Sequence, residues 1–475
     1  MRLTSSFLLV AVLSSSVLAA PGRPPDTDSP PVAAGPPTPG EKRLEDILTE
    51  LIAIDTSPAG STTVAAEAMA KRLRAGGLPA ADVEVLGPSA KRKNLVARLR
   101  GTAGAAKKPI LLLAHLDVVV ANKEDWTVPP YQLTRRNGWL YGRGTTDDKH
   151  MAAAFVAILL DLVEAKAKLD RDVVVILTAD EESGDDNGVD WLLKNHRAKI
   201  DAELAINEGG DGARRGGKPL ANELQASEKV YQTYVVEAAH PGGHSSLPPP
   251  ETAITRLVRA LDRIGKHKFP LTDSPVARGL LRELAKTEKG AVAARLEAGA
   301  RGNRGAQTKL AAADPYFNAL LRTTCVATRL EAGHADNALP QRAKATLNCR
   351  ILPGQEPAKL LATLLQVTSD PSITIVPKAV AIASSPSPLS PLIVGAVERA
   401  TAAVWPGVPV MPSMSTGATD GLYLRNAGIP TYGTSGMMGD VEDIRAHGQD
   451  ERIDERALRD GYKYLGILVR DLATR

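Results

Sequence analysis

Residues 173–182 read Val-Val-Val-Ile-Leu-Thr-Ala-Asp-Glu-Glu. The apolar run at its start shows no polar alternation, which is typical of a strand buried on both faces of a sheet. Short runs rich in Val, Ile and Leu also occupy 83–86, 94–98 and 110–114, and the apolar residues of 151–165 predict a long helix before the strand at 173–178. Strands that alternate with helices predict an α/β domain with a mostly parallel sheet covered on both sides.

The first domain is expected to be discontinuous in sequence, with its second part near the C-terminus after an inserted segment. Its other expected elements are helices at 42–54, 61–75, 391–405 and 455–473 and a strand at 429–432. We therefore expect this domain to consist of residues 41–227 and 379–475.

The interrupting segment, residues 228–378, has a different pattern. Its expected elements are strands at 230–238, 323–330, 343–351 and 373–377 and helices at 252–264 and 357–367. The order β-α-β-β-α-β is that of a ferredoxin-like module. The charged, Ala-rich and Gly-rich stretch 271–313 has no place in this plan, and we interpret it as a helical insertion whose role the sequence does not reveal.

The chain has two cysteines, Cys325 and Cys349, on the two strands of the expected central hairpin. If the turn is centred on Asn337, paired residue numbers sum to about 674, and the two cysteines satisfy this sum. They could form a disulfide or remain two buried thiols, and both alternatives stay open. Because two thiolates cannot build a four-cysteine site, any metal must be held by carboxylates and imidazoles.

Composition excludes several classes of protein. The chain has 475 residues, of which 43% are hydrophobic and 24% charged, so it is long enough for several domains and has the mix of an ordinary folded protein. Its 58 Lys and Arg against 54 Asp and Glu leave a net charge of only +4. We therefore expect no nucleic-acid partner.

The N-terminus has the pattern of an export signal. Met1-Arg2 precede an apolar run at 8–13 and small residues at 16–20, so residues 1–20 are expected to be a signal peptide cleaved after Ala19 or Ala20. Ser14 to Ser16 interrupt the apolar run too early for a membrane anchor, and no integral membrane span is expected after cleavage. Residues 21–40 are Pro-rich and should form an extended tether. We expect an exported protein, periplasmic or secreted.

Polar residues follow several of the expected strands of the first domain. The segments concerned are His115-Leu116-Asp117, Asp147-Asp148-Lys149, Asp180-Glu181-Glu182 and Asn207-Glu208. Carboxyl ends of parallel strands share one edge of a sheet, where ligands bind. Unpaired carboxylates gathered there would repel one another and be costly to bury, so the pattern indicates divalent cations at this edge.

The full set of motifs resembles the M20 family of zinc-dependent peptidases and amidohydrolases, which includes carboxypeptidases, dipeptidases and aminoacylases. The resemblance extends from about Glu41 to the C-terminus. Its motifs are His115-Leu116-Asp117, Gly142-Arg143-Gly144 with Asp147-Asp148-Lys149, Asp180-Glu181-Glu182, Asn207-Glu208-Gly209-Gly210, Gly243-His244-Ser245-Ser246, Asn337-Ala338-Leu339-Pro340, Arg350-Ile351-Leu352-Pro353-Gly354 and Ala446-His447-Gly448.

The resemblance implies a dinuclear site with two Zn²⁺ ions per chain. Asp147 would bridge the ions, His115 and Glu208 would complete one site, and Glu182 and His447 would complete the other. This set of protein ligands leaves a coordination position at which a bound water can be exchanged, as catalytic zinc requires.

The resemblance also implies details around this site. Asp117 would be the carboxylate that fixes the tautomer of His115, and the peptide bond between Asp147 and Asp148 would be cis. The family usually has Gly where this chain has His150. We expect His150 not to be a ligand.

The remaining site residues implied by the resemblance act on water and substrate. Glu181 would be the general base for a water activated by the metal pair. His244 would stabilise the oxyanion, often from the second subunit of a dimer, so a homodimer is one expectation. Asn337 and Arg350 would bind the substrate, and Arg350 would bind its carboxylate. Gly417 in the segment 416–421 would offer backbone contacts.

These observations lead to one principal hypothesis and two alternatives. We expect an exported dinuclear zinc exopeptidase that hydrolyses the amide bond of dipeptides or short peptides with a free carboxylate. The close alternative is an N-acyl-amino-acid amidohydrolase of the aminoacylase type, and the distant one is a non-catalytic metal-containing peptide-binding protein. Residues 41–227 and 379–475 would then form the catalytic domain, and 228–378 a lid or dimerisation domain.

Overall fold

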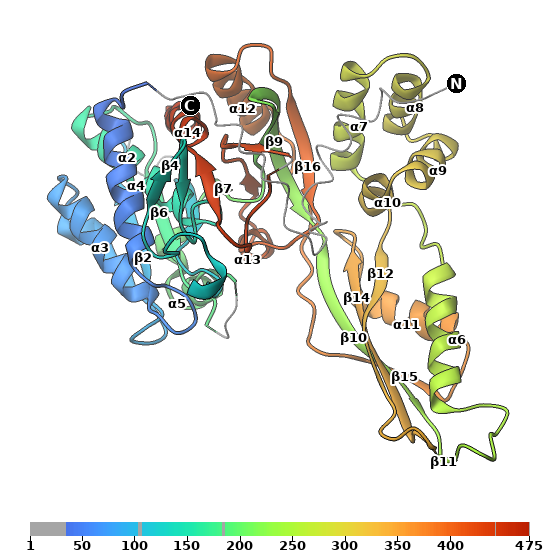
Figure 1. Cartoon of the computed structure of the whole chain (residues 1–475). Coiled ribbons are helices and arrows are strands. Elements are labelled where there is room, and N and C mark those ends of the chain that lie inside the picture. Colours follow the sequence, from blue (N-terminus) through green and yellow to red (C-terminus); the bar gives the residue numbers. More distant parts are fainter. Residues whose placement is uncertain (1–34, 103–106, 183–185, 442, 475) are drawn as a thin grey trace. The chain divides into compact units, whose positions relative to one another are not determined.

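The computed structural model describes residues 35–102, 107–182, 186–441 and 443–474 (Figure 1). The expected signal peptide and all but the last residues of the expected tether lie outside this part of the chain. The described residues form two compact units. Unit 1 contains the residues up to Ala226, Ser387–Ser413 and those from Thr419 onward, and unit 2 contains Ser227–Pro386 and Met414–Ala418.

Unit 1 is built on a ten-stranded sheet with the order β1-β2-β6-β3-β7-β17-β9-β8-β18, in which β16 also pairs with β9. The strands are β1 Val83–Leu86, β2 Asn94–Leu99, β3 Ile110–His115, β6 Val173–Thr178, β7 Leu204–Asn207, β8 Gly212–Arg215, β9 Lys218–Glu228, β16 Val410–Ser415, β17 Thr431–Gly433 and β18 Met438–Asp440. A separate three-stranded sheet joins β4 Thr134–Arg136, β5 Trp139–Tyr141 and β19 Arg452–Asp454.

The large sheet is mixed, so the prediction of a mostly parallel sheet is wrong for most of its outer strands, although β18 at one edge is parallel to β8. The central strands β6, β3, β7 and β17 are parallel. In contrast, β1 pairs antiparallel with β2, β2 with β6, and β8 with β9. Only two residues, Gly216 and Gly217, connect β8 to β9, and both have positive φ. So short a connection permits only a hairpin, because a parallel crossover needs a dozen or more residues.

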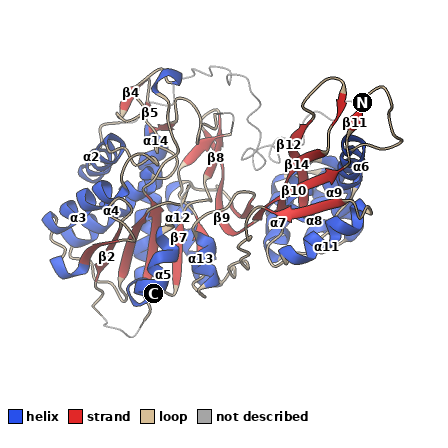
Figure 2. Ribbon diagram, turned by 90° about the horizontal axis from the view of Figure 1, so that it is seen from below, coloured by secondary structure: helices blue, strands red, loops and turns tan. Residues whose placement is uncertain are grey.

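Helices cover both faces of the sheet (Figure 2). Those of unit 1 are α2 Pro39–Ala53, α3 Thr62–Ala75, α4 Lys149–Glu164, α5 Gly188–Ile200, α12 Pro391–Val404, α13 Gly421–Asn426 and α14 Glu455–Ala473. On one face, α5 and α13 pack in a cluster with Leu111, Leu113 and Ile176. Helices α4 and α14 contact β3 without contributing to that cluster, so they cover the other face. The residues of α4 from Lys149 to Leu159 are all buried, which explains their apolar sequence.

The start of α2 follows directly from local sequence. Thr38 caps the helix, and its side chain accepts a hydrogen bond from the backbone N–H of Glu41 while the Glu41 carboxylate accepts from the N–H of Thr38. Pro39 occupies the first helical position, where its missing N–H costs nothing.

Unit 2 contains an antiparallel four-stranded sheet with the order β12-β14-β10-β15. Its elements are β10 Val230–Ala239, α6 Ala253–Lys266, β12 Thr324–Ala332, β14 Arg342–Ile351, α11 Pro357–Thr368 and β15 Ile373–Pro377, with a small sheet of β11 Gly243–His244 and β13 Ala338–Leu339. Helices α6 and α11 share one core with this four-stranded sheet, which includes Tyr234, Leu257, Leu347 and Leu364.

The insertion between α6 and β12 consists of four helices that contact one another in sequence. They are α7 Pro275–Thr287, α8 Gly290–Ala300, α9 Arg304–Ala313 and α10 Pro315–Leu321. The insertion thus extends beyond the predicted end at residue 313. No described helix is long and apolar enough to cross a membrane.

Cys325 and Cys349 are directly paired on β12 and β14, and their sulfurs are bonded. Near the cysteines, paired residue numbers sum to 674, as predicted, and a bulge between Ala327 and Arg329 shifts the register beyond them. The structure therefore selects the disulfide from the two alternatives that the sequence left open.

We predict that replacing both cysteines, Cys325→Ala with Cys349→Ala, lowers the free energy of unfolding of unit 2. The sulfurs close a loop with a sequence separation of 24 residues, for which the loss of chain entropy in the unfolded state is worth about 3 kcal/mol. Urea unfolding of the variant and of the oxidised wild type measures the difference. The intact mass of the wild type shows whether its disulfide is formed. If it is formed, equal unfolding midpoints and slopes for the wild type and the variant would contradict the prediction.

Candidate active site

The candidate site lies at the carboxyl edge of the parallel strands of unit 1. His115 is the last residue of β3, and it pairs in register with Thr178, the last residue of β6. Glu181 and Glu182 follow β6, and Glu208 follows β7. The parallel arrangement therefore brings these side chains to one edge, as the sequence predicts.

Five side chains form a continuous series of contacts around Asp147. His115 Nε2 lies 2.8 Å from Asp147 Oδ1, and His447 Nε2 lies 3.0 Å from Asp147 Oδ2. Glu208 Oε2 is 3.8 Å from His115 Nε2, and Glu182 Oε1 is 2.7 Å from His447 Nε2. Each oxygen of Asp147 thus faces one imidazole, and each imidazole has a second carboxylate of its own.

His115 is oriented differently from the sequence-based expectation. Its Nδ1 lies 2.9 Å from the backbone carbonyl oxygen of Asp117 and 3.7 Å from the Asp117 carboxylate. The backbone carbonyl therefore accepts the Nδ1 proton and leaves Nε2 directed at Asp147. The Asp117 carboxylate instead accepts the backbone N–H groups of Glu181 and Glu182, at 3.2 and 3.0 Å, and so joins the end of β3 to the segment after β6.

The peptide bond between Asp147 and Asp148 is cis. Asp148 is fully buried, and one of its oxygens lies within 4.8 Å of candidate ligand atoms of His115 and Glu208, so the three could hold one metal ion. His150 is also buried, with Nδ1 3.5 Å from Asp148 Oδ1. Burial lowers the pKa of His150 to about 4, so this imidazole is neutral at physiological pH.

The electrostatics of the site favour a bound cation. Burial raises the pKa of Glu208 and of Glu181 well above their usual range, because several carboxylates share one poorly solvated place. Hydrogen bonds that the His447 imidazole donates to the carboxylates of Asp147 and Glu182 raise its pKa to about 10. A divalent cation neutralises the same charge and takes carboxylate oxygens and imidazole nitrogens as ligands. The residues present therefore fit bound divalent metal.

Glu181 is partly buried and lies near a second buried acid, Asp420. The Asp420 carboxylate accepts hydrogen bonds from Thr178 Oγ1 at 3.1 Å and from Asn187 Nδ2 at 2.5 Å. Burial raises the pKa of Asp420 to about 6.

The other predicted site residues belong to unit 2, where they form two separate pairs. His244 on β11 is exposed and pairs in register with Ala338, and the backbone N–H of Ser245 donates to the carbonyl of Asn337. Arg350 stands near the opposite end of β14, where its guanidinium lies over the Tyr231 ring and donates to the carbonyl of Thr416 at 3.1 Å.

Gly417 is the neighbour of Thr416, and its N–H donates to Ser415 Oγ at 3.0 Å. Arg350 and Gly417 are thus brought together within unit 2, and so are His244 and Asn337. Arg350 sits opposite Tyr231 in the ladder with β10, whereas Arg342 at the other end of β14 sits opposite Ala239.

Comparison with known proteins identifies the group to which this chain belongs. Residues 111–471 match the model of peptidase family M20/M25/M40. The chain is a member of this family. The N-fatty-acyl-amino acid synthase/hydrolase PM20D1 of Homo sapiens is 30% identical to this M20 chain over 385 residues, which cover 77% of this chain and 74% of the relative.

Two further similarities agree with this finding, one in sequence and one in fold. The probable carboxypeptidase S-like 2 of Dictyostelium discoideum is 27% identical over 363 residues, or 73% of this chain and 68% of the relative. The M20 metallo-carboxypeptidase Sso-CP2 from Sulfolobus solfataricus shares the fold, with a TM-score of 0.67 at 20% identity over 90% of this chain and 99% of that one. This M20 chain is an enzyme of the metallopeptidase and amidohydrolase type.

Three acids near the M20 site were given no role by the sequence: Asp148, Asp420 and Glu451. Asp148 belongs to the motif Asp147-Asp148-Lys149, and Asp420 lies in the segment 416–421. In both cases the neighbouring residues in the sequence do not indicate which side chains the acid contacts. Glu451 contacts the segment 142–146 across more than 300 residues of chain, so the fold is needed to show what it binds. Its position four residues after His447 is the one available signal.

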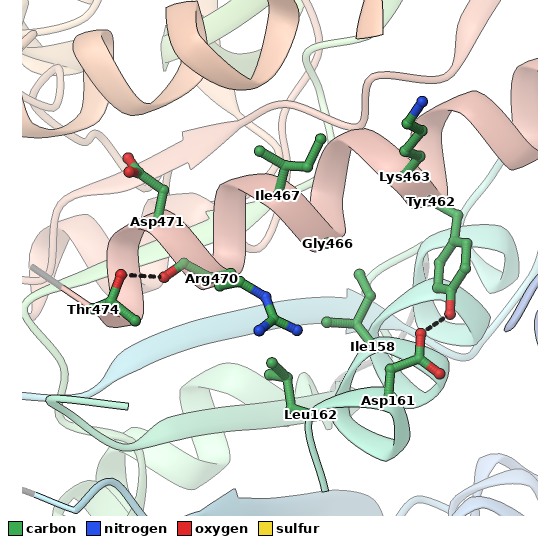
Figure 3. A pocket seen from close by; sticks show the side chains of 10 residues that line it. All are labelled: Ile158, Asp161, Leu162, Tyr462, Lys463, Gly466, Ile467, Arg470, Asp471 and Thr474. Carbon is green, nitrogen blue, oxygen red and sulfur yellow. Dashed lines mark hydrogen bonds between the residues drawn. The ribbon is translucent and has the colours of Figure 1, made fainter. Parts of the chain in front are cut away.

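A groove elsewhere on unit 1 is distinct from this site. Figure 3 shows it between α4 and α14, where Ile158, Leu162, Tyr462 and Arg470 are among the residues that line it. The Tyr462 hydroxyl donates to Asp161 within the groove. None of the five predicted metal ligands lines it.

We predict that adding Zn²⁺ or Co²⁺ to the metal-free M20 enzyme raises its thermal unfolding temperature. Metal at 100 times its Kd would stabilise the folded state by about 2.7 kcal/mol. Asp147→Asn should remove most of this gain, because Asp147 contacts both imidazoles. Asp161→Asn, the matched control in the groove, should keep it. If Asp147→Asn keeps its metal content and the full metal-dependent rise in unfolding temperature, Asp147 is not a ligand shared by two ions.

Proposed function

We propose that this chain is an exported dinuclear zinc amidohydrolase that cleaves the amide bond of an amino acid bearing a free carboxylate. The observation that carries the proposal is the placement of Asp147, which directs one carboxylate oxygen to His115 and the other to His447. A shared carboxylate of this kind suits two neighbouring cations. Residues 1–20 support export, and N-terminal sequencing of the mature protein should find a start at Ala20 or Pro21.

The five proposed ligands are His115, Asp147, Glu182, Glu208 and His447. Bound Zn²⁺ would lower the pKa of a water molecule and polarise the amide carbonyl. Asp117 would support the site by holding the backbone of Glu181 and Glu182 through its carboxylate.

Glu181 is the proposed general base and acid. Burial raises the pKa of Glu181, which moves this carboxylate toward the pH at which one group can both accept and return a proton. Glu181 would accept the proton of the attacking water and deliver it to the departing nitrogen. The carbonyl oxygen, which gains negative charge, would be stabilised by His244.

Arg350 is the proposed anchor for the substrate carboxylate. No carboxylate among the described residues pairs with its guanidinium, which is held by the Thr416 carbonyl and the Tyr231 ring. Burial lowers the pKa of Arg350 from its ordinary value, yet the group remains charged near neutral pH. A planar guanidinium donates two parallel hydrogen bonds to a carboxylate. Gly417 and Asn337 would contribute further contacts to the substrate.

N-acyl amino acids are the substrate class that we place first. The relative that is 30% identical carries the name N-fatty-acyl-amino acid synthase/hydrolase, which reverses the order of the two hypotheses drawn from the sequence. Short peptides are the second candidate, favoured by the similarity to the probable carboxypeptidase S-like 2. Both classes present an amide next to a free carboxylate, so the same residues would serve either.

We predict that the zinc-loaded enzyme hydrolyses N-acyl amino acids with kcat/KM at least about tenfold above that for dipeptides of the same C-terminal residue, a difference of about 1.4 kcal/mol in transition-state binding. Glu181→Gln should retain the metal content and lose about 10²-fold or more of the rate. A preference for dipeptides would restore the exopeptidase hypothesis. Hydrolysis of neither class, with metal bound, would favour a binding protein.

The geometry of unit 2 also supports a homodimer. Arg350 and Arg342 are eight residues apart on β14, about 26 Å along an extended strand, and His244 and Asn337 lie beyond the Arg342 end. One copy of unit 2 therefore cannot present both His244 and Arg350 to one small substrate. We propose that unit 2 is a ferredoxin-like lid and dimerisation domain, and that His244 of one chain serves the other chain's site.

Strand β12 is the proposed contact between the two copies. It is the edge strand of its sheet, and its residues from Val326 to Ala332 are exposed, including Val326 and Leu330. An edge strand of this length, with apolar side chains in solvent, offers unpaired backbone groups to a second strand.

We predict that two inactive variants, Glu181→Gln and His244→Ala, restore activity when mixed under conditions that allow subunits to exchange. Half of the dimers would then be mixed, and one of the two sites in each would be intact, which gives about a quarter of the wild-type rate per chain. Size-exclusion chromatography with light scattering monitors the dimer. No recovery despite exchange would show that His244 does not act across subunits.

A further inference from the structure

Glu451 is a buried carboxylate that holds the segment leading to Asp147. It is fully buried, and its carboxylate accepts hydrogen bonds from the backbone N–H of Gly144 at 3.1 Å and from the N–H and hydroxyl of Thr146 at 2.7 and 2.9 Å. Its backbone carbonyl accepts the N–H of Gly142 at 3.0 Å. Glu451 therefore fixes the turn immediately before Asp147 through four donors.

Arg143 extends these contacts to the segment that carries His447. Its guanidinium is buried and forms an ion pair with Glu451 through Nη1. Nη2 donates to the carbonyl oxygens of His447 and Gly448, at 3.3 and 3.1 Å. The Trp126 ring lies 5.1 Å from the guanidinium carbon and covers it. One side chain, which itself belongs to the turn before Asp147, thus contacts both Glu451 and the backbone of His447.

The backbone of His447 needs such support. Its φ is +61°, in the left-handed region that residues with a side chain rarely adopt. A residue keeps this conformation only where its surroundings hold it there. The bond from Arg143 to the His447 carbonyl is one such contact, and it acts at the residue whose imidazole faces Asp147.

We propose that Glu451 and Arg143 together, which we term the Glu451–Arg143 clamp, are positioning residues that set the affinity of the site for divalent metal. The clamp fixes the spacing between Asp147 and His447, two ligands that are 300 residues apart in sequence. It contacts the backbone of the ligand segments and none of the reacting groups. The inference rests on the proposed metal site and adds residues that determine its strength.

The inference is tested on the metal-free full-length enzyme, with Zn²⁺ or Co²⁺ alone as the probe. Glu451→Gln keeps the shape of the side chain but places an amide N–H₂ against the donors of Gly144 or Thr146. Arg143→Lys keeps the charge but cannot reach Glu451 and both carbonyls. Each variant should bind metal about 10-fold to 100-fold more weakly in competition with a chelator, and excess metal should restore much of the lost hydrolysis.

Asp454→Asn is the matched control. Asp454 is another buried carboxylate of the same segment, which pairs with Arg214 and caps α14 without contacting the ligand segments. This variant should lose stability and keep its metal affinity. Should Glu451→Gln fail to fold, Thr146→Ala removes one donor to Glu451 with both charges intact, and it should weaken metal binding by a smaller factor.

The outcomes separate this inference from the proposed function. If the wild type binds neither metal, the proposed function fails. If the wild type binds metal and Arg143→Lys binds it within about twofold of that affinity, the inference fails and the proposed function stands. If Asp454→Asn weakens metal binding as much as Arg143→Lys does, the effect is one of general stability and the inference is also overturned.

Discussion

The candidate site depends on the crowding of negative charge around Asp147. Its two oxygens face His115 and His447, and further acids approach each imidazole. Burial raises the pKa of Glu208 because the charged form lacks solvent there. Such an arrangement is costly without positive charge. Bound divalent cations would account for a fold that maintains this arrangement.

Three different sets of interactions hold these side chains in place although their negative charges repel one another. Parallel pairing of β3 with β6 and β7 sets the positions of His115, Glu182 and Glu208. The Asp117 carboxylate holds the segment after β6 by two backbone bonds. The Glu451–Arg143 clamp joins the turn before Asp147 to the segment of His447. Each of these acts mainly on the backbone, so the side chains of the proposed ligands remain available to a metal.

In the proposed function, unit 2 would supply a different kind of chemistry. Arg350 and His244 are suited to the substrate carboxylate and to the oxyanion, but the length of β14 separates them. In the proposed function, this separation means that one chain would not complete the site alone. Catalysis and assembly would then be linked, because the exposed edge strand β12 belongs to the same sheet that holds Arg350.

The sequence by itself determined which residue types lie at the ends of the central strands, because apolar runs and the polar residues after them are local patterns. It also determined the opposition of Cys325 and Cys349, which follows from counting around one turn. The direction of the outer strands, the use of the Asp117 carboxylate and the role of Glu451 were decided only in the tertiary structure. They depend on contacts between segments distant in the chain, and no local periodicity encodes such contacts.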